Sequence, residues 1–265
     1  MLAAHGLNNA HSWLSLSMAF LSFSLCASAV YIINDIVDLP YDRQHPRKQY
    51  RPLASGAVPL WLAKILIPSL LIISMTLALN LEYIFVFWLV IYFVITCLYS
   101  LALKRLLLID CFVLALLYSL RILAGASVSH YPVSFWLLAF SIFLFLSLAF
   151  VKRYAELKDY LIVGRAYHVE DGLLIQILGV TSGYLSALVL ALYLNSAEVL
   201  VLYATPSIMW AAVPIYLFWI SWMWMQAQRG HMHDDPLVFA LKNRTSLLTG
   251  CIFAVMLIIS TLRFL

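Results

Sequence analysis

Charged side chains are scarce in this sequence. Asp, Glu, Lys and Arg make up only 11% of its 265 residues, whereas hydrophobic residues make up 65%. Soluble globular domains carry about 25% charged residues, so the composition excludes an ordinary soluble fold and indicates a polytopic membrane protein. A sustained alternation of apolar and polar residues is also lacking, which argues against strands and favours helices throughout.

Cysteine is scarce as well. The four cysteines lie in apolar segments with no paired spacing, at positions 26, 97, 111 and 251. This arrangement excludes a disulfide framework and a zinc site of the paired-cysteine type. The first residues lack a basic segment and an A-x-A cleavage site, so we expect no signal peptide there.

What the sequence has in abundance is apolar runs long enough to cross a bilayer. They lie near residues 12–33, 60–80, 83–102, 106–127, 132–151, 172–194, 206–227 and 245–263. The sequence therefore predicts an all-α, polytopic membrane helical bundle with about eight transmembrane helices.

The basic residues predict the orientation of this bundle. Of the 16 Lys and Arg residues, all but Lys64, Arg121 and Arg263 fall in alternate connections. These connections are residues 34–59, 103–105, 152–171 and 228–244. The positive-inside rule makes them cytoplasmic, so we expect an integral protein of the cytoplasmic (inner) membrane. The net charge of +4 is then a matter of topology and phosphate binding and does not indicate nucleic acid.

The most informative stretch runs from Asn34 to Asp42 and holds an amide and three carboxylates. Asn34, Asp38 and Asp42 recur every four residues, so on a helix they would share one face. Like charges on one face repel one another, which favours a cation among them, and hard oxygen ligands favour Mg²⁺. Asp35 is a further ligand or a partner of the ligands. Pro40 is expected to bend the helix before Asp42.

A basic segment follows at once, with Arg43, Arg47, Lys48 and Arg51. Cations beside a carboxylate cluster suit a polyanionic leaving group, so the two segments together predict a Mg²⁺–diphosphate site that faces the cytoplasm. The alternative is a solvated loop of mixed charge. If the carboxylates repel one another without metal, Asp38→Ala should abolish turnover and leave the fold unharmed.

The pattern N-D-x-x-D-x-x-x-D, followed by basic residues and R-P-L-A-S-G, resembles the first aspartate-rich motif of the UbiA superfamily of intramembrane prenyltransferases. The resemblance implies a nine-helix fold in which this motif follows the second helix. Here the motif follows the first apolar run. We therefore expect residues 1–265 to form a single UbiA-like transferase domain that is short by one helix at the N-terminus.

The superfamily usually has a second D-x-x-x-D motif, where this chain has Lys152, Arg153 and Glu156. This string resembles the polyprenyl-phosphate (decaprenyl-phosphate) phosphoribosyltransferase branch, as do residues 99–104, 121–125 and 234–240. The resemblance implies that Lys152, Arg153 and Glu156 contact the second substrate and that Tyr99 and Lys104 bind diphosphate.

The reaction expected from this branch is phosphoribosyl transfer from phosphoribosyl pyrophosphate to a polyprenyl phosphate. One alternative is a prenyltransferase that moves a polyprenyl chain from its diphosphate to an aromatic or other small acceptor. An alternative of another class is a transporter or lipid-binding membrane protein without catalysis. The expected partners are a polyprenyl lipid, a diphosphate-bearing donor and membrane lipids.

Overall fold

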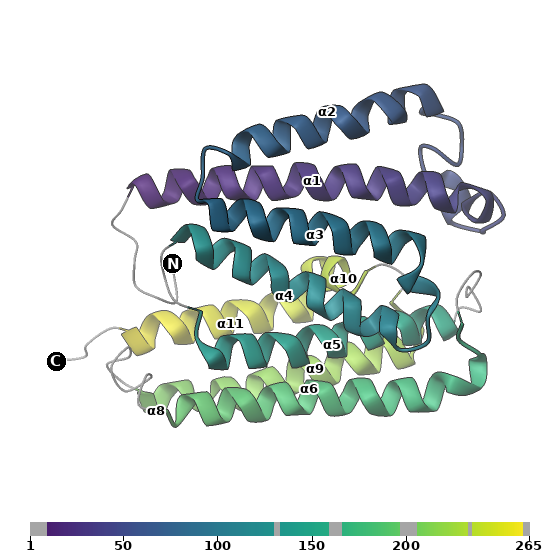
Figure 1. Cartoon of the computed structure of the whole chain (residues 1–265). Coiled ribbons are helices and arrows are strands. Elements are labelled where there is room, and N and C mark those ends of the chain that lie inside the picture. The colour runs from purple at the N-terminus through teal and green to yellow at the C-terminus, as the bar shows by residue number, and fades with distance from the viewer. Residues whose placement is uncertain (1–9, 130–132, 159–165, 197–205, 233–234, 262–265) are drawn as a thin grey trace. The chain divides into compact units, whose positions relative to one another are not determined.

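The computed structural model describes residues 10–129, 133–158, 166–196, 206–232 and 235–261, and every regular element within these ranges is helical (Figure 1). The all-α prediction is therefore confirmed for the described residues. The chain divides into two compact units, one containing helices α1 to α4 and the other helices α5 to α11.

The first unit has four long helices and two short 3₁₀ turns. They are α1 (Ala10–Asp42), η2 (Lys48–Tyr50), α2 (Leu60–Ala78), α3 (Tyr83–Leu101), η3 (Leu103–Arg105) and α4 (Ile109–Ser129). Figure 1 shows α1 between α2 and α3, and it packs against both of them and against α4. The core lies where α1, α3 and α4 meet, and Cys26, Phe85 and Tyr92 are buried there.

The second unit is built on the pair α5 (Phe135–Lys158) and α6 (Gly172–Leu194), with η4 (Val169–Asp171) leading into α6. The remaining helices are α8 (Pro206–Met209), α9 (Ala212–Gln228), α10 (Pro236–Lys242) and α11 (Arg244–Thr261). Helix α9 packs on both α5 and α6, and α10 contacts α5.

Small and hydroxyl side chains hold the helices together, as is usual inside membranes, where apolar contact with lipid is as favourable as contact with another helix. In the first unit, Ser22 Oγ donates to Ser74 O at 2.8 Å and Ser74 Oγ donates to Ser22 O at 2.7 Å, which joins α1 to α2. In the second unit, a Cβ at Gly179 would lie only 2.1 Å from the Trp224 ring. Gly179 therefore lets α9 approach α6 closely.

Six described helices are long and apolar enough to cross a membrane, and α10 with α11 makes a seventh candidate if that pair, bent by 81°, is one span. The predicted span at 206–227 is divided into α8 and the 17-residue α9. The eight spans expected from the sequence are thus an approximate count, and the polytopic helical bundle is confirmed.

The first helix is longer than predicted. The apolar run was expected to end near Ile33 and to be followed by a connection over residues 34–59, with a bend at Pro40 if the helix continued. Instead α1 continues without interruption to Asp42, with Pro40 inside it. Pro40 has no N–H to donate to Ile36 O, so α1 lacks one backbone hydrogen bond in its last turn and nevertheless continues. Because the helix continues, the polar motif lies on regular helical backbone.

Candidate active site

The first half of the site joins the end of α1 to the turn η3. Lys104 Nζ donates to Asp38 Oδ1 at 2.6 Å and to Asn34 Oδ1 at 3.0 Å. Asn34 Nδ2 in turn donates to Asp38 Oδ2 at 3.1 Å, a contact between residues four apart on the helix. The Lys104 side chain is only 7% exposed, so this ion pair is well shielded from solvent.

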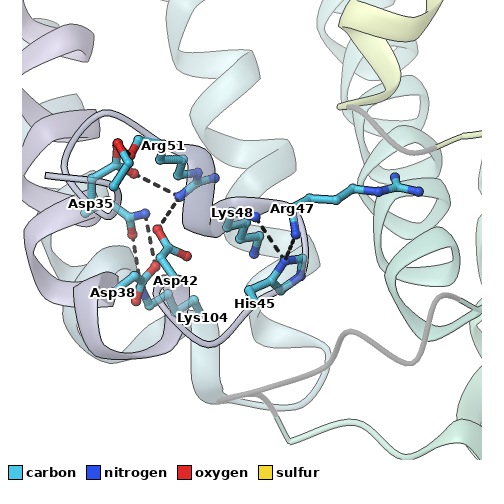
Figure 2. Close-up of polar contacts among 10 residues, drawn as sticks. Asp35, Asp38, Asp42, His45, Arg47, Lys48, Arg51 and Lys104 are labelled. Atoms are coloured by element: carbon cyan, nitrogen blue, oxygen red, sulfur yellow. Dashed lines mark hydrogen bonds and ion pairs between the residues drawn. The ribbon is translucent and has the colours of Figure 1, made fainter. Parts of the chain in front are cut away.

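The second half joins α1 to the segment that follows η2. Arg51 Nη1 donates to Asp35 Oδ1 at 2.9 Å and to Asp42 Oδ2 at 2.8 Å. Asp35 and Asp42 are seven residues apart and so lie two turns apart on the same side of α1. Figure 2 shows Arg51 and Lys104 reaching the same group of aspartates from separate segments.

The two cations therefore sort the motif into two sets, Asn34 and Asp38 with Lys104, and Asp35 and Asp42 with Arg51. In the described part of the chain, no group of three or more carboxylate, imidazole or thiol side chains is arranged to hold a metal ion. Mg²⁺ commonly takes only one or two protein carboxylates, with water and phosphate as its other ligands. The hard oxygen donors of this motif fit that requirement.

His45 holds the basic segment in shape. Its Nδ1 accepts hydrogen bonds from the backbone N–H groups of Arg47 and Lys48, both at 3.1 Å. Burial, followed by the nearby charge of Lys48, lowers the pKa of His45 below its ordinary value, so the neutral ring that can accept these bonds is favoured. In this neutral form the proton is on Nε2.

The other cations of this segment differ in accessibility. The side chains of Arg43 and Arg47 are exposed and form no ion pair with a described carboxylate, and Lys48 is half-buried. In Figure 2 the Arg47 side chain extends away from the aspartates. Tyr99 is half-buried in the last turn of α3.

A cavity of about 490 Å³ lies in the first unit between α1, α3 and α4. Its lining is mostly apolar and reaches Tyr31, one helical turn before Asn34. Arg121 is the one charged residue in the lining, and its Nη2 donates to Tyr92 Oη at 3.1 Å. The Arg121 guanidinium also lies over the rings of Tyr92 and Tyr118, at 5.5 and 5.0 Å from their centroids, which favours the cation at this depth.

The second charged string lies at the end of α5 in the other unit. Lys152 Nζ pairs with Asp235 Oδ2 at 2.8 Å, and both side chains are about a third to a quarter exposed, at 32% and 26%. Arg153 is fully buried, pairs with Glu156 and stacks over the Tyr167 ring at 5.3 Å. In the described conformation Lys152 is therefore accessible to a ligand and Arg153 is not.

The sequence did not reveal the role of His45 or the partner of Asp235, although Asp235 belongs to the string 234–240 noted above. His45 lies within the basic segment, and its neighbour Pro46 was the only local sign of a turn. Asp235 Oδ1 accepts a hydrogen bond from Leu237 N at 3.1 Å and so caps α10, and Asp235 Oδ2 accepts one from Lys152 Nζ. The partner could not be found from sequence because 83 residues separate the pair. Arg165, a basic residue of the predicted connection 152–171, lies outside the described residues.

Known proteins resemble this chain over most of its length. The model of the UbiA prenyltransferase family matches residues 1–259. The uncharacterized protein y4nM of Sinorhizobium fredii is 34% identical over 252 residues, 92% of this chain. The nodulation protein NoeC of Azorhizobium caulinodans is 33% identical over 241 residues, 87% of this chain and 77% of NoeC.

A decaprenyl-phosphate phosphoribosyltransferase of Mycobacterium tuberculosis is 39% identical over 141 residues, which is 53% of this chain and 47% of that enzyme. The match to y4nM likewise covers 49% of y4nM, so the chain spans about half the length of these relatives. The family match covers nearly every residue, including both charged segments and the helices that carry them. This helical membrane protein belongs to the UbiA prenyltransferase family.

Proposed function

We propose that this protein is a Mg²⁺-dependent membrane transferase that moves a phosphoribosyl group from phosphoribosyl pyrophosphate to a polyprenyl phosphate. The observation that carries the proposal is the pairing of the Asn34–Asp42 motif with Lys104 and Arg51, two cations suited to a diphosphate. The similarity to decaprenyl-phosphate phosphoribosyltransferases supports this donor and acceptor.

In the proposed reaction, the bond between the anomeric carbon and the diphosphate oxygen breaks, and its electron pair leaves with the diphosphate. An oxygen of the lipid phosphate forms the new bond at that carbon. The protein must stabilise the charge that develops on the leaving oxygens, which preorganised cations do well in a site with little water. Lys104 and Arg51 are assigned this role, with Arg43, Arg47 and Lys48 holding the rest of the diphosphate.

Asn34, Asp38 and Asp42 would hold the metal, with Asp35 as a further ligand or a partner of the ligands. Mg²⁺ bound there would neutralise charge on the leaving diphosphate. An acceptor that is already an anion needs no general base, which agrees with the lack of a second carboxylate motif at Lys152, Arg153 and Glu156. These three residues are proposed to form the surroundings of the acceptor phosphate, with Lys152 as the contact.

The apolar cavity beside α1 offers a place for the polyprenyl chain, because its lining ends one turn before Asn34. The positive-inside rule puts the site on the cytoplasmic side of the inner membrane, where a soluble, highly charged donor can reach it.

The experiment is a comparison of donors with the purified protein. Phosphoribosyl pyrophosphate and a polyprenyl phosphate should give Mg²⁺-dependent release of pyrophosphate and a phosphoribosylated lipid. Consumption of a polyprenyl diphosphate with alkylation of an aromatic acceptor would instead assign the chain to the prenyl-transferring members of its family. If the protein catalyses neither reaction but transports a lipid or a solute in vesicles, an enzymatic role is contradicted.

A variant at Lys152 tests how the acceptor is held. Lys152→Ala should raise the KM for the polyprenyl phosphate by about one to two decades, because the phosphate loses one charge-assisted hydrogen bond. The KM for phosphoribosyl pyrophosphate and the Mg²⁺ dependence should not change. Lys158→Ala, an exposed cation two turns further along the same helix, is the matched control. Equal effects of both variants would argue for a nonspecific attraction of the anionic lipid.

A further inference from the structure

Lys104 and Arg51 bind one oxygen of each of the four side chains proposed to hold the metal ion. Lys104 Nζ is 2.6 Å from an oxygen of Asp38 and 3.0 Å from that of Asn34. Arg51 Nη1 is 2.9 and 2.8 Å from oxygens of Asp35 and Asp42. Each of the four oxygen-bearing side chains of the motif therefore already accepts a hydrogen bond from a cation (Figure 2).

Charge balance opposes the entry of a metal ion alone. Three carboxylates and two cations give the cluster a net charge of −1, and a divalent ion would bring it to +1. The ion would also push the ammonium of Lys104, a side chain only 7% exposed, off its carboxylate without providing another anion. A cation that loses its partner in a shielded site is strongly disfavoured.

A diphosphate removes this penalty, because its oxygens accept hydrogen bonds from the displaced ammonium and guanidinium groups while they also coordinate the metal. We propose that Lys104 and Arg51 are exchange residues, which give up the motif oxygens to the metal and transfer to the diphosphate. The site then takes metal and diphosphate together as one unit and binds either alone weakly. This inference rests on the proposed function, which supplies the metal and the diphosphate.

Linkage makes the exchange measurable, since the diphosphate must raise the affinity for metal by the same factor as the metal raises the affinity for diphosphate. A lysine that only touched phosphate would not affect the binding of metal alone. A lysine that only stabilised the fold would affect both ligands equally. Only the exchange requires two effects together when the cation is removed. The metal without diphosphate must bind more tightly, and the coupling between metal and diphosphate must become weaker.

The experiment uses the full chain in nanodiscs, Mn²⁺ as the metal and methylene diphosphonate, which cannot be hydrolysed, as the diphosphate. Equilibrium dialysis against a protein-free chamber separates metal held by the protein from metal held by free diphosphonate. The variants are Lys104→Met and Arg51→Met, and the control is Lys64→Met, an exposed lysine on α2 that is not assigned to the site. Arg51 is 38% exposed, so its variant keeps the test available if Lys104→Met does not fold.

In the wild type and in Lys64→Met, diphosphonate should raise the affinity for Mn²⁺ about tenfold or more. In Lys104→Met and Arg51→Met, the affinity for Mn²⁺ alone should rise roughly fivefold, and the coupling should shrink to roughly a third of its wild-type factor or less. Unchanged coupling in both variants would overturn the exchange and leave the proposed function intact. A wild type that binds no diphosphonate at any Mn²⁺ concentration would overturn the proposed function itself.

Discussion

Asp38 and Lys104 make the shortest of the contacts between α1 and η3, and the pair is shielded, with side-chain exposures of 22% and 7%. This pairing changes what is expected of the aspartate. The sequence suggested carboxylates that only repel one another, so that removing one would leave the fold unharmed. With Lys104 as a partner, Asp38 is expected to stabilise the folded protein as well as to contribute to the proposed metal site.

Asp38→Asn should therefore lower stability as well as abolish turnover. The change removes the carboxylate that accepts from Lys104 Nζ at 2.6 Å, and breaking a shielded ion pair by removing one partner costs about 3 kcal/mol. Thermal unfolding in detergent measures the loss. The double variant Asp38→Asn with Lys104→Met should regain most of the stability and remain inactive. If Asp38→Asn unfolds at the wild-type temperature, the pair contributes nothing to the fold.

His45 makes the shape of the basic segment depend on pH. Its Nδ1 can accept from Arg47 N and Lys48 N only while it is unprotonated, and burial holds its pKa below the ordinary value of 6.5. A group with a lowered pKa binds fewer protons when folded than when unfolded, so stability rises with pH across this window. The contribution is present above pH 6.5 and is lost as the pH falls through the lowered pKa.

We expect protease cleavage between residues 43 and 51 to accelerate as the pH falls from 7.5 to 5. In His45→Asn the acceleration should disappear, because an amide oxygen can accept from the same backbone groups and does not titrate in this range. His168→Asn, which changes a histidine of the other unit, is the control and should keep the wild-type pH dependence. If wild type and His45→Asn show the same pH dependence of cleavage, then groups other than His45 cause that dependence.

At the scale of elements, the first unit combines tight and open packing. Ser22 and Ser74 join α1 to α2 through reciprocal hydrogen bonds, while the cavity is left between α1, α3 and α4. Gly125 of α4 lines this cavity, and a Cβ added there would meet no atom within 4 Å. This position therefore has room for a Cβ, and it faces the cavity, where further side-chain atoms can extend.

Gly125→Leu should fill part of the cavity and raise the KM for a long polyprenyl phosphate at least several-fold. The KM for phosphoribosyl pyrophosphate should stay unchanged. The unfolding temperature should stay equal or rise, because leucine favours a helix over glycine by about 0.8 kcal/mol. Gly250→Leu on α11, also a position with open space, is the control. Equal KM values for the lipid in Gly125→Leu and in the wild type would mean that the polyprenyl chain does not bind in this cavity.

At the scale of the whole molecule, the distribution of basic residues predicts how the chain is oriented across the membrane. Among the residues that the structure describes, six helices qualify as spans by length and composition. The basic residues gather in alternate connections between the predicted spans. The segment after α1, which carries the basic residues of the site, is therefore expected in the cytoplasm, and the connection between α2 and α3 outside.

Labelling with a thiol reagent that cannot cross membranes tests this direction. In a variant without native cysteines, Asn80→Cys should react in intact cells, and Ala57→Cys should react only after the membrane is opened. Both positions are exposed in the structure. Ala57 is preferred to its neighbour Gly56, whose φ of +81° strains any side chain. Reaction of position 57 in intact cells would contradict the cytoplasmic placement of the site.

The sequence by itself determined the class of fold, the approximate bounds of the helices and the family. Apolar runs and helical hydrogen bonding are local properties, so the predicted run 172–194 coincides with α6. The other runs end within a few residues of their helices, except that α1 continues to Asp42, α5 continues to Lys158, and the run 206–227 is divided into α8 and α9. The four-residue spacing of Asn34 and Asp38 likewise placed them on one face, where they are hydrogen-bonded.

Only the tertiary structure decided which cation meets which carboxylate. Asp38 is paired across 66 residues with Lys104, while Asp42, which shares its spacing, is paired with Arg51. Lys152 and Arg153 are adjacent in sequence, yet one is accessible and the other buried. Ion pairs between distant segments depend on helix packing and on which side chains solvent can reach, and neither is encoded in local spacing.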